Sequence, residues 1–151
     1  MVSRSTEVRD DIATQLTRVL SAAPPSGVIS AYLFGSHAEH RAHRQSDVDV
    51  GVLLDRAAYP SEEARFNERV RLSAWLIAEL RANVVDVVVL NDAPPGLGSR
   101  IVTRGVSVYC ALPDADHAFR RDVQLRAADL EPFLTRMRRL KLAALARKSV
   151  Q

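Results

Sequence analysis

"LFGSHAEHRAHRQSDVDVGVLL", residues 33–54, is the stretch that decides the fold and raises the question of function. An apolar run ends at Gly35-Ser36, a polar and basic segment follows, and two aspartates then interrupt a second apolar run. Side chains alternate between the two faces of a strand, so Asp47 and Asp49 share one face while Val48, Val50 and Val52 point the other way, into the core. Two acids on the same side of a buried strand indicate a binding or catalytic site.

The rest of the chain predicts an alternation of helices and strands around this stretch. Apolar residues at steps of three and four indicate helices, and short runs of β-branched residues indicate strands. Helices are expected over about 6–22, 61–81, 97–104 and 114–148, and strands over 28–34, 47–54, 84–90 and 106–111. This order predicts an α/β (α+β) domain with a small mixed β-sheet of about four strands, flanked by helices.

Length and composition limit what this domain can be. The 151 residues fit one domain, 1–151, with a core over about 28–110 and a C-terminal helical segment over about 114–148. No run of about 18 apolar residues indicates a membrane span, and the N-terminus lacks the apolar core of a signal peptide. The single cysteine, Cys110, excludes an internal disulfide, fits a cytoplasmic location, and is expected to be a small buried side chain.

A third acid, Asp86, interrupts the valine-rich run "VVDVVVL" over residues 84–90. A lone carboxylate is costly to bury in a central strand. If this strand pairs beside the 47–54 strand, Asp86 joins Asp47 and Asp49. Close carboxylates in a poorly hydrated site repel one another unless one is protonated or a cation lies between them. Mg²⁺ fits such a site, because it takes carboxylate oxygens and completes its shell with water and substrate phosphates.

Gly35-Ser36 supplies a candidate phosphate site beside these acids. It ends one strand and begins the helical-looking "SHAEHR". A helix N-terminus presents free N–H groups to phosphate, glycine allows close approach of the backbone, and the serine hydroxyl can donate a hydrogen bond. Phosphate held beside metal-binding carboxylates is the arrangement used in phosphoryl or nucleotidyl transfer.

Other polar residues carry weaker signals. The spacing of His37, His40 and His43 is compatible with a metal site, although an exposed polar turn is the favoured interpretation. Arg100 and Arg104 are within reach of a nucleotide in principle, but surface positions are favoured. Trp75, on the predicted 61–81 helix, is expected in or near the core.

The C-terminal segment combines an apolar stripe with a basic face. The stripe contains Leu130, Phe133, Leu134, Met137, Leu140 and Leu145, and the basic residues are Arg136, Arg138, Arg139, Lys141, Arg147 and Lys148. Pro132 is expected to start a new turn or to bend the helix. Packing of the stripe on the domain's own sheet is the default prediction, and contact with a partner protein or a second copy of the chain stays open.

At Gly35-Ser36 and Asp47-x-Asp49 the sequence resembles the nucleotidyltransferase superfamily of the DNA polymerase β type. More narrowly, it resembles the minimal nucleotidyltransferase (MNT) antitoxins of HEPN/MNT toxin–antitoxin pairs. The resemblance implies the polymerase β-like fold, with Asp47 and Asp49 binding two Mg²⁺ ions. It also implies that Asp86 binds one of these ions and helps to activate the acceptor, and that Gly35 and Ser36 hold the triphosphate of ATP.

The resemblance implies a protein adenylyltransferase that moves AMP from ATP to a tyrosine of a partner HEPN ribonuclease toxin and neutralises it. It implies homo- or hetero-oligomers, and neither a membrane nor direct contact with nucleic acid. The sequence departs from the family at His37, Glu39 and His40, where relatives often carry arginines and a glycine. Two alternatives stay open: a small-molecule nucleotidyltransferase of the aminoglycoside type, and a catalytically weak antitoxin that acts by binding alone.

Overall fold

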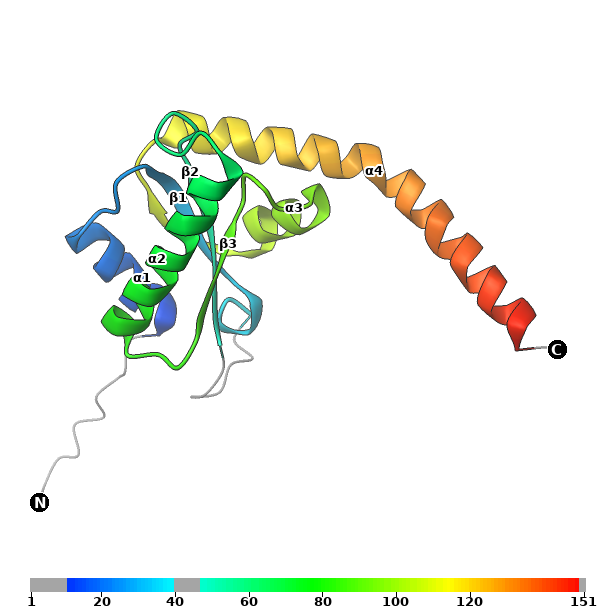
Figure 1. The fold of residues 1–151 in the computed structure, drawn as a ribbon, viewed down its shortest axis with the longest axis horizontal. Coiled ribbons are helices and arrows are strands. Elements are labelled where there is room, and N and C mark those ends of the chain that lie inside the picture. The colour runs from blue at the N-terminus through cyan, green and yellow to red at the C-terminus, as the bar shows by residue number, and fades with distance from the viewer. Residues whose placement is uncertain (1–10, 40–46, 150–151) are drawn as a thin grey trace, which may run out of the picture.

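A four-stranded mixed sheet forms the centre of the computed structural model, which describes residues 11–39 and 47–149 (Figure 1). Its strands are β1 (Val28–Phe34), β2 (Val48–Leu54), β3 (Val85–Val89) and β4 (Val106–Cys110), in the spatial order β3-β2-β1-β4. β1 pairs antiparallel with β2 and with β4, whereas β2 and β3 are parallel. The predicted mixed sheet and its four strands are therefore confirmed.

Four α-helices and one short 3₁₀ turn complete the described chain. They are α1 (Ile12–Ala22), α2 (Glu62–Leu80), α3 (Pro95–Arg104) and α4 (Pro113–Lys148), with the 3₁₀ turn at Gly35–His37. Ser61 caps α2 as predicted, because its hydroxyl accepts a hydrogen bond from the Ala64 N–H at 3.0 Å. Asp11 caps α1 in the same way through the Thr14 N–H. Residues 6–10 of the first predicted helix lie outside the described residues.

Helices cover both faces of the sheet. On one face, leucines of α1 and α2 such as Leu16 and Leu72 pack on the alternate valines of β2 and β3. On the other face, Ile101 of α3 and Val123 of α4 pack against Tyr32 of β1. The alternate valines of β2, Val48, Val50 and Val52, are buried in the first of these clusters, as the alternation of strand side chains predicts.

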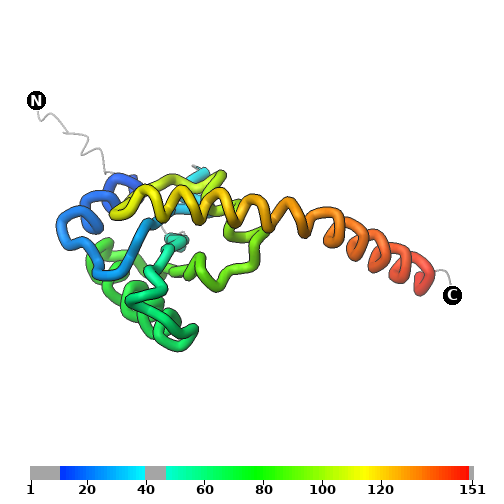
Figure 2. Tube along the Cα trace, turned by 90° about the horizontal axis from the view of Figure 1, so that it is seen from above, coloured from blue at the N-terminus to red at the C-terminus, as the bar shows by residue number. Residues whose placement is uncertain are grey.

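α4 differs from the other helices because most of it leaves the domain. Val123 is its one buried residue among those described, and the helix then extends away from the sheet (Figures 1 and 2). Pro132 lies inside the helix, and Figure 1 shows a bend in the orange part of the ribbon, as expected where a proline removes a backbone N–H. We call residues 130–148 the arm.

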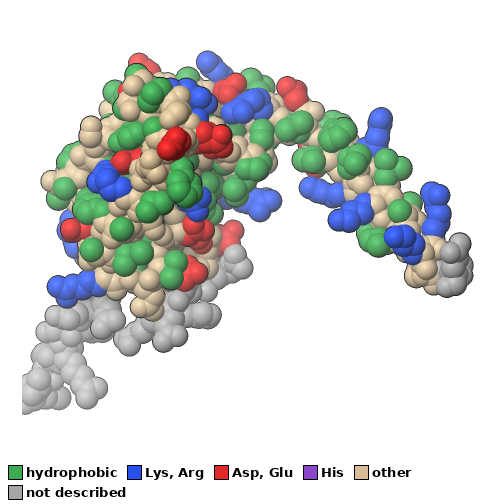
Figure 3. Space-filling model, in the orientation of Figure 1, with side chains coloured by type: hydrophobic (Ala, Val, Ile, Leu, Met, Phe, Trp, Pro, Cys, Tyr) green, Lys and Arg blue, Asp and Glu red, His purple; other side chains and the backbone are tan. Residues whose placement is uncertain are grey.

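The predicted packing of the apolar stripe on the domain's own sheet is wrong. All its members are exposed: Leu130, Phe133, Leu134, Met137, Leu140 and Leu145. Figure 3 shows hydrophobic and basic side chains along the arm, whose far end extends away from the rest of the molecule. The stripe therefore has no covering partner within the described chain.

Two predictions about single side chains have opposite outcomes. Cys110 is exposed rather than buried, because it lies at the end of β4, which is an edge strand with few buried residues. Trp75 is partly buried and packs against the core, as predicted. No helix within the described ranges is long and apolar enough to cross a membrane.

Candidate active site

Three neighbouring strands bring the predicted site residues into one row. Phe34 of β1 pairs with Asp49 of β2, and Asp49 pairs with Asp86 of β3. Gly35 directly follows Phe34, and Asp47 directly precedes β2. Because neighbouring strands lie about 4.8 Å apart, Gly35, Asp49 and Asp86 follow one another across the sheet at short intervals.

Gly35 is required at the end of β1 for two reasons. Its φ is +74°, a left-handed conformation that side chains with a Cβ rarely adopt. A Cβ at this position would also overlap the Oδ2 atom of Asp49. The missing side chain of Gly35 therefore makes room for the Asp49 carboxylate. Ser36 is partly buried beside it, within a 3₁₀ turn of three residues rather than the longer helix that "SHAEHR" suggests.

Asp49 experiences the charge of its neighbours. Partial burial raises the pKa of its carboxyl group, and the negative charges of Asp86 and Asp47 raise it further, while His37 acts in the opposite direction. The carboxylates of Asp86 and Asp47 are thus both close enough to Asp49 to repel its charge. A cation placed among them would relieve this repulsion.

The donor set of this site suits Mg²⁺. Three carboxylates supply hard oxygen ligands, which Mg²⁺ prefers. Within residues 11–39 and 47–149, no group of three or more histidine, cysteine or acidic side chains converges closely enough to hold a metal ion unaided. Mg²⁺ commonly binds through one or two carboxylates and the phosphates of a substrate. The residues therefore fit a site that the substrate completes.

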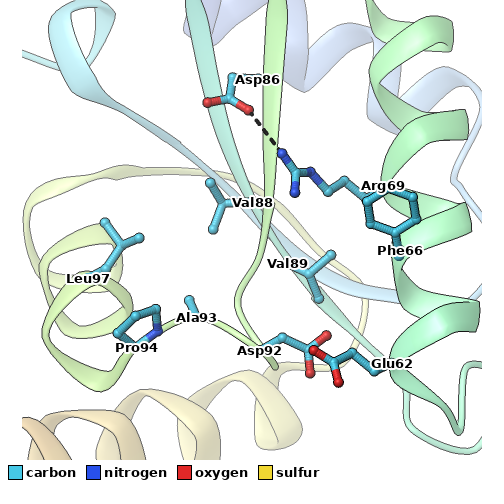
Figure 4. A pocket seen from close by; sticks show the side chains of 10 residues that line it. All are labelled: Glu62, Phe66, Arg69, Asp86, Val88, Val89, Asp92, Ala93, Pro94 and Leu97. Atoms are coloured by element: carbon cyan, nitrogen blue, oxygen red, sulfur yellow. Dashed lines mark ion pairs between the residues drawn. The ribbon is translucent and has the colours of Figure 1, made fainter.

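Asp86 is not buried in a central strand, which corrects the sequence interpretation. β3 is an edge strand of the sheet, and the Asp86 side chain is 52% exposed. Its Oδ1 atom lies 3.6 Å from an Nη atom of Arg69 on α2 (Figure 4). The expected position beside Asp49 is nevertheless confirmed by the strand register.

A cavity lies on each side of this row. The Gly35 cavity, of about 320 Å³, is lined by Gly35, Glu39, Arg100 and Arg104 together with apolar residues. The Asp86 cavity, of about 260 Å³, lies between α2, β3 and α3 (Figure 4). Leu97 of α3 lines both cavities. Of the three predicted carboxylates, Asp86 lines the Asp86 cavity, and Gly35, at the other end of the row, lines the Gly35 cavity.

Some residues that sequence patterns left on the surface line the two cavities. Arg100 and Arg104 are exposed, as expected, but both line the Gly35 cavity from one face of α3. Phe66 contributes to the apolar pattern of α2, yet it lines the Asp86 cavity instead of the core. His40 and His43 lie outside the described residues, so the three-histidine alternative stays a prediction.

Comparisons with known proteins agree with this geometry. Residues 15–114 match the family model described as "Polymerase beta, Nucleotidyltransferase". A chain in a crystal structure of a toxin–antitoxin with AMP-PNP is 25% identical, with a TM-score of 0.61 over 89% of this chain and 98% of that one. No curated protein matches the sequence significantly.

Two further solved structures are similar in fold. One is the toxin–antitoxin MntA–HepT, at 22% identity and a TM-score of 0.56, with 89% of this chain and 96% of that chain covered. The other is a tri-AMPylated Shewanella oneidensis HEPN toxin in complex with MNT antitoxin, at 21% identity and a TM-score of 0.57. The alignment covers 88% of this chain and 97% of that chain.

Proposed function

The chain belongs to the polymerase beta nucleotidyltransferase family, and from this premise we propose that it transfers AMP from ATP to a tyrosine of a HEPN-type toxin and so acts as the antitoxin. The observation that carries the proposal is the row of Gly35, Asp49 and Asp86 with a cavity on each side. Transfer with the attacking and leaving oxygens in line needs them on opposite sides of the phosphorus atom. The proposal assigns one of these sides to each of the two cavities.

On the Gly35 side the chain holds the triphosphate. The backbone at Gly35 and Ser36 can approach phosphate closely, because no Cβ stands in the way at Gly35. The guanidinium groups of Arg100 and Arg104 face the same cavity and offset the negative charge of the phosphates. Glu39 also lines this cavity, and its charge opposes triphosphate binding unless a cation offsets it.

On the Asp86 side the acceptor hydroxyl is activated. Its proton passes to the Asp86 carboxylate, and its oxygen forms an ester bond with the α-phosphorus of ATP. The bond between that phosphorus and the bridging oxygen breaks, and pyrophosphate leaves on the Gly35 side. Asp47 and Asp49, with Asp86, would hold two Mg²⁺ ions, which when bound neutralise the charge of the reacting phosphates.

The neighbours and the arm support a protein acceptor. The most similar of the solved structures described above holds a toxin–antitoxin with AMP-PNP, and another holds an AMPylated HEPN toxin with its MNT antitoxin. The arm carries a continuous exposed apolar stripe, and such a patch is typical of a protein–protein contact. Its basic residues favour an acidic partner surface. The toxin, in this proposal, covers the arm.

Glu39 favours one alternative, a catalytically weak antitoxin that neutralises its toxin by binding alone. A carboxylate in the wall of the Gly35 cavity repels phosphate unless it meets a cation. The small-molecule alternative has less support, because the Asp86 cavity of about 260 Å³ is smaller than the roughly 300–1,000 Å³ of sites for drug-sized ligands.

Intact mass spectrometry of the co-purified partner tests the proposal. The complex is incubated with ATP and Mg²⁺, with the wild type and the Asp47→Asn/Asp49→Asn variant in parallel. We expect AMP-sized mass increments with the wild type and a rate lower by at least roughly a hundredfold with the variant. A tightly bound but unmodified partner would leave inhibition by binding alone. Absence of any bound partner would overturn the antitoxin function.

The unfolding temperature of the Asp47→Asn/Asp49→Asn variant shows whether a loss of transfer comes from lost chemistry or from a damaged fold. Asparagine at position 49 removes the carboxyl group whose pKa is raised by burial and by the charges of Asp86 and Asp47, and asparagine at position 47 removes one of those charges. A carboxyl group whose pKa is raised by folding destabilises the folded state when it is ionised. In the absence of divalent cations at pH 7, the variant should therefore unfold at a temperature no lower than the wild type.

A further inference from the structure

We propose that the Asp86 cavity is the acceptor subsite and that it takes an aromatic side chain carrying a hydroxyl, packed against Phe66. This inference rests on the proposed function and specifies where the acceptor enters. The row of Gly35, Asp49 and Asp86 across the sheet determines the side from which the acceptor approaches. If the triphosphate lies at Gly35, the acceptor must approach Asp49 from the opposite side, where Asp86 and its cavity lie.

The lining of the cavity matches the two-sided character of a phenol. Its walls are mainly apolar and come from three elements: Phe66 of α2, Val88 and Val89 of β3, and Ala93, Pro94 and Leu97 in and before α3. Figure 4 shows the Asp86–Arg69 pair at one end of this apolar wall, and Glu62 and Asp92 at the other. A tyrosine ring has an apolar body and one polar tip, so its hydroxyl can reach Asp86 while the ring contacts the walls.

Phe66 is the residue in the cavity whose position the fold does not explain. Its side chain is 57% exposed, although it is a large aromatic group on a helix that packs on the sheet. Arg69 follows it by three residues, so both lie on the same side of α2. An exposed aromatic ring in the same cavity as Asp86 can stack on an aromatic acceptor, and aromatic pairs contribute about 0.5–1.5 kcal/mol beyond burial.

The ion pairs at the two ends of the cavity differ in strength. At one end, both carboxylate oxygens of Asp92 accept hydrogen bonds from Arg65, at 2.9 and 3.0 Å. This buried arginine also binds the backbone oxygen of Tyr59, so it holds that end rigid. At the other end, the exposed Arg69–Asp86 pair is longer, at 3.6 Å. A pair of this kind is weak, so an incoming hydroxyl can replace Arg69 at Asp86.

Steady-state kinetics with the partner toxin as acceptor test this subsite. We expect Phe66→Ala to raise the KM for the acceptor up to about tenfold, the factor that corresponds to the stacking contribution. The KM for ATP should stay unchanged, and Phe66→Trp should restore much of the acceptor affinity. Val70→Ala is the matched control, since Val70 is equally exposed on α2 but does not line the cavity. An effect on the KM for ATP alone, or none, would overturn the inference.

A binding measurement keeps this inference separate from the proposed function. N-acetyl-tyrosinamide is titrated into the chain, and chemical-shift changes are followed by NMR. The inference expects changes at Phe66, Val88 and Leu97 that weaken in Phe66→Ala and persist in Val70→Ala. Changes elsewhere, or none, would overturn it. Because no transfer is needed, a wild type that fails to AMPylate refutes the proposed function but leaves this test decisive.

Discussion

Leu72 and Leu140 are the same residue on similar amphipathic helices, but they have opposite environments. Leu72 of α2 is 1% exposed and belongs to the cluster that covers the sheet, whereas Leu140 on the arm is 58% exposed. Both stripes have the regular spacing of a helix that buries one face. The comparison teaches that periodicity indicates a face in need of cover, while only the structure tells whether the same chain supplies it.

The largest difference between these two regions should appear in stability. Leu72→Ala removes a buried side chain and should lower the free energy of unfolding by about 2–5 kcal/mol. Leu140→Ala should change it by less than about 0.5 kcal/mol, because both residues are good helix formers and the site is exposed. Chemical denaturation of the isolated chain measures both. A large effect at Leu140 would mean that the arm is already covered, for example by a second copy of the chain.

The second test sharpens the comparison within the domain, at the two ends of the Asp86 cavity. Arg65 is 7% exposed and makes the bidentate pair with Asp92, so Arg65→Ala should lower the free energy of unfolding by about 3 kcal/mol. Arg69, one turn further along α2, is 45% exposed, and Arg69→Ala should cost less than about 0.5 kcal/mol. If denaturation curves gave similar losses of unfolding free energy for the two variants, the Arg65–Asp92 end of the cavity would be no more rigid than the Arg69–Asp86 end, and the distinction would be refuted.

The third test concerns the hydrogen bonds that connect the first turns of α4 to β1. Asp116, in the first turn of α4, accepts hydrogen bonds at 2.6 Å from Ser30 and from the Tyr32 hydroxyl of β1. Arg120 also donates to that hydroxyl, at 3.1 Å, and lies over the Tyr32 ring. Tyr32→Phe should lower the free energy of unfolding by about 1 kcal/mol at pH 7, because Asp116 keeps only one of its two donors.

The same contacts between β1 and α4 predict that the stability of the fold depends on pH. Burial, and then the hydrogen bond to Asp116, raise the pKa of Tyr32 to about 12. A pKa above the unfolded value of about 10 means that folding favours the protonated phenol. Its contribution is complete below about pH 10 and is lost as the pH rises to about 12. Denaturation across this range should show a loss in the wild type that Tyr32→Phe lacks. Parallel curves would exclude this role for Tyr32.

Much of the candidate site follows from local chemistry in the sequence. Alternation in a strand places Asp47 and Asp49 on one face, and Asp86 joins them if one pair of strands is adjacent, which the register confirms. The cavities could not be predicted in this way. Arg100 lines the Gly35 cavity, and Phe66 lines the Asp86 cavity, only because of how α3 and α2 cross the sheet. That angle depends on packing among residues distant in sequence.

Cys110 and the arm illustrate a second limit of sequence patterns. "VSVYCA" predicts a strand correctly, but nothing in it tells whether the strand is central or at an edge. At the edge, Cys110 is exposed. Residues of the arm have the composition of a packed helix, and their exposure arises because the sheet is already covered by α3 and the first turns of α4. Competition between elements for the same face cannot be read from either element alone.

The pairing of the strands also bears on how the site assembles during folding. Gly35 directly follows β1 and Asp49 lies in β2, and these consecutive antiparallel strands make contacts that are local in sequence. Asp86 arrives only when the α2 crossover closes and β3 pairs in parallel with β2. Contacts between residues that are close in sequence cost less loop-closure entropy than contacts between distant residues. Gly35 and Asp49 are therefore brought together by one pair of consecutive strands, whereas Asp86 and the arginines of α3 join them only through long-range closure of the chain.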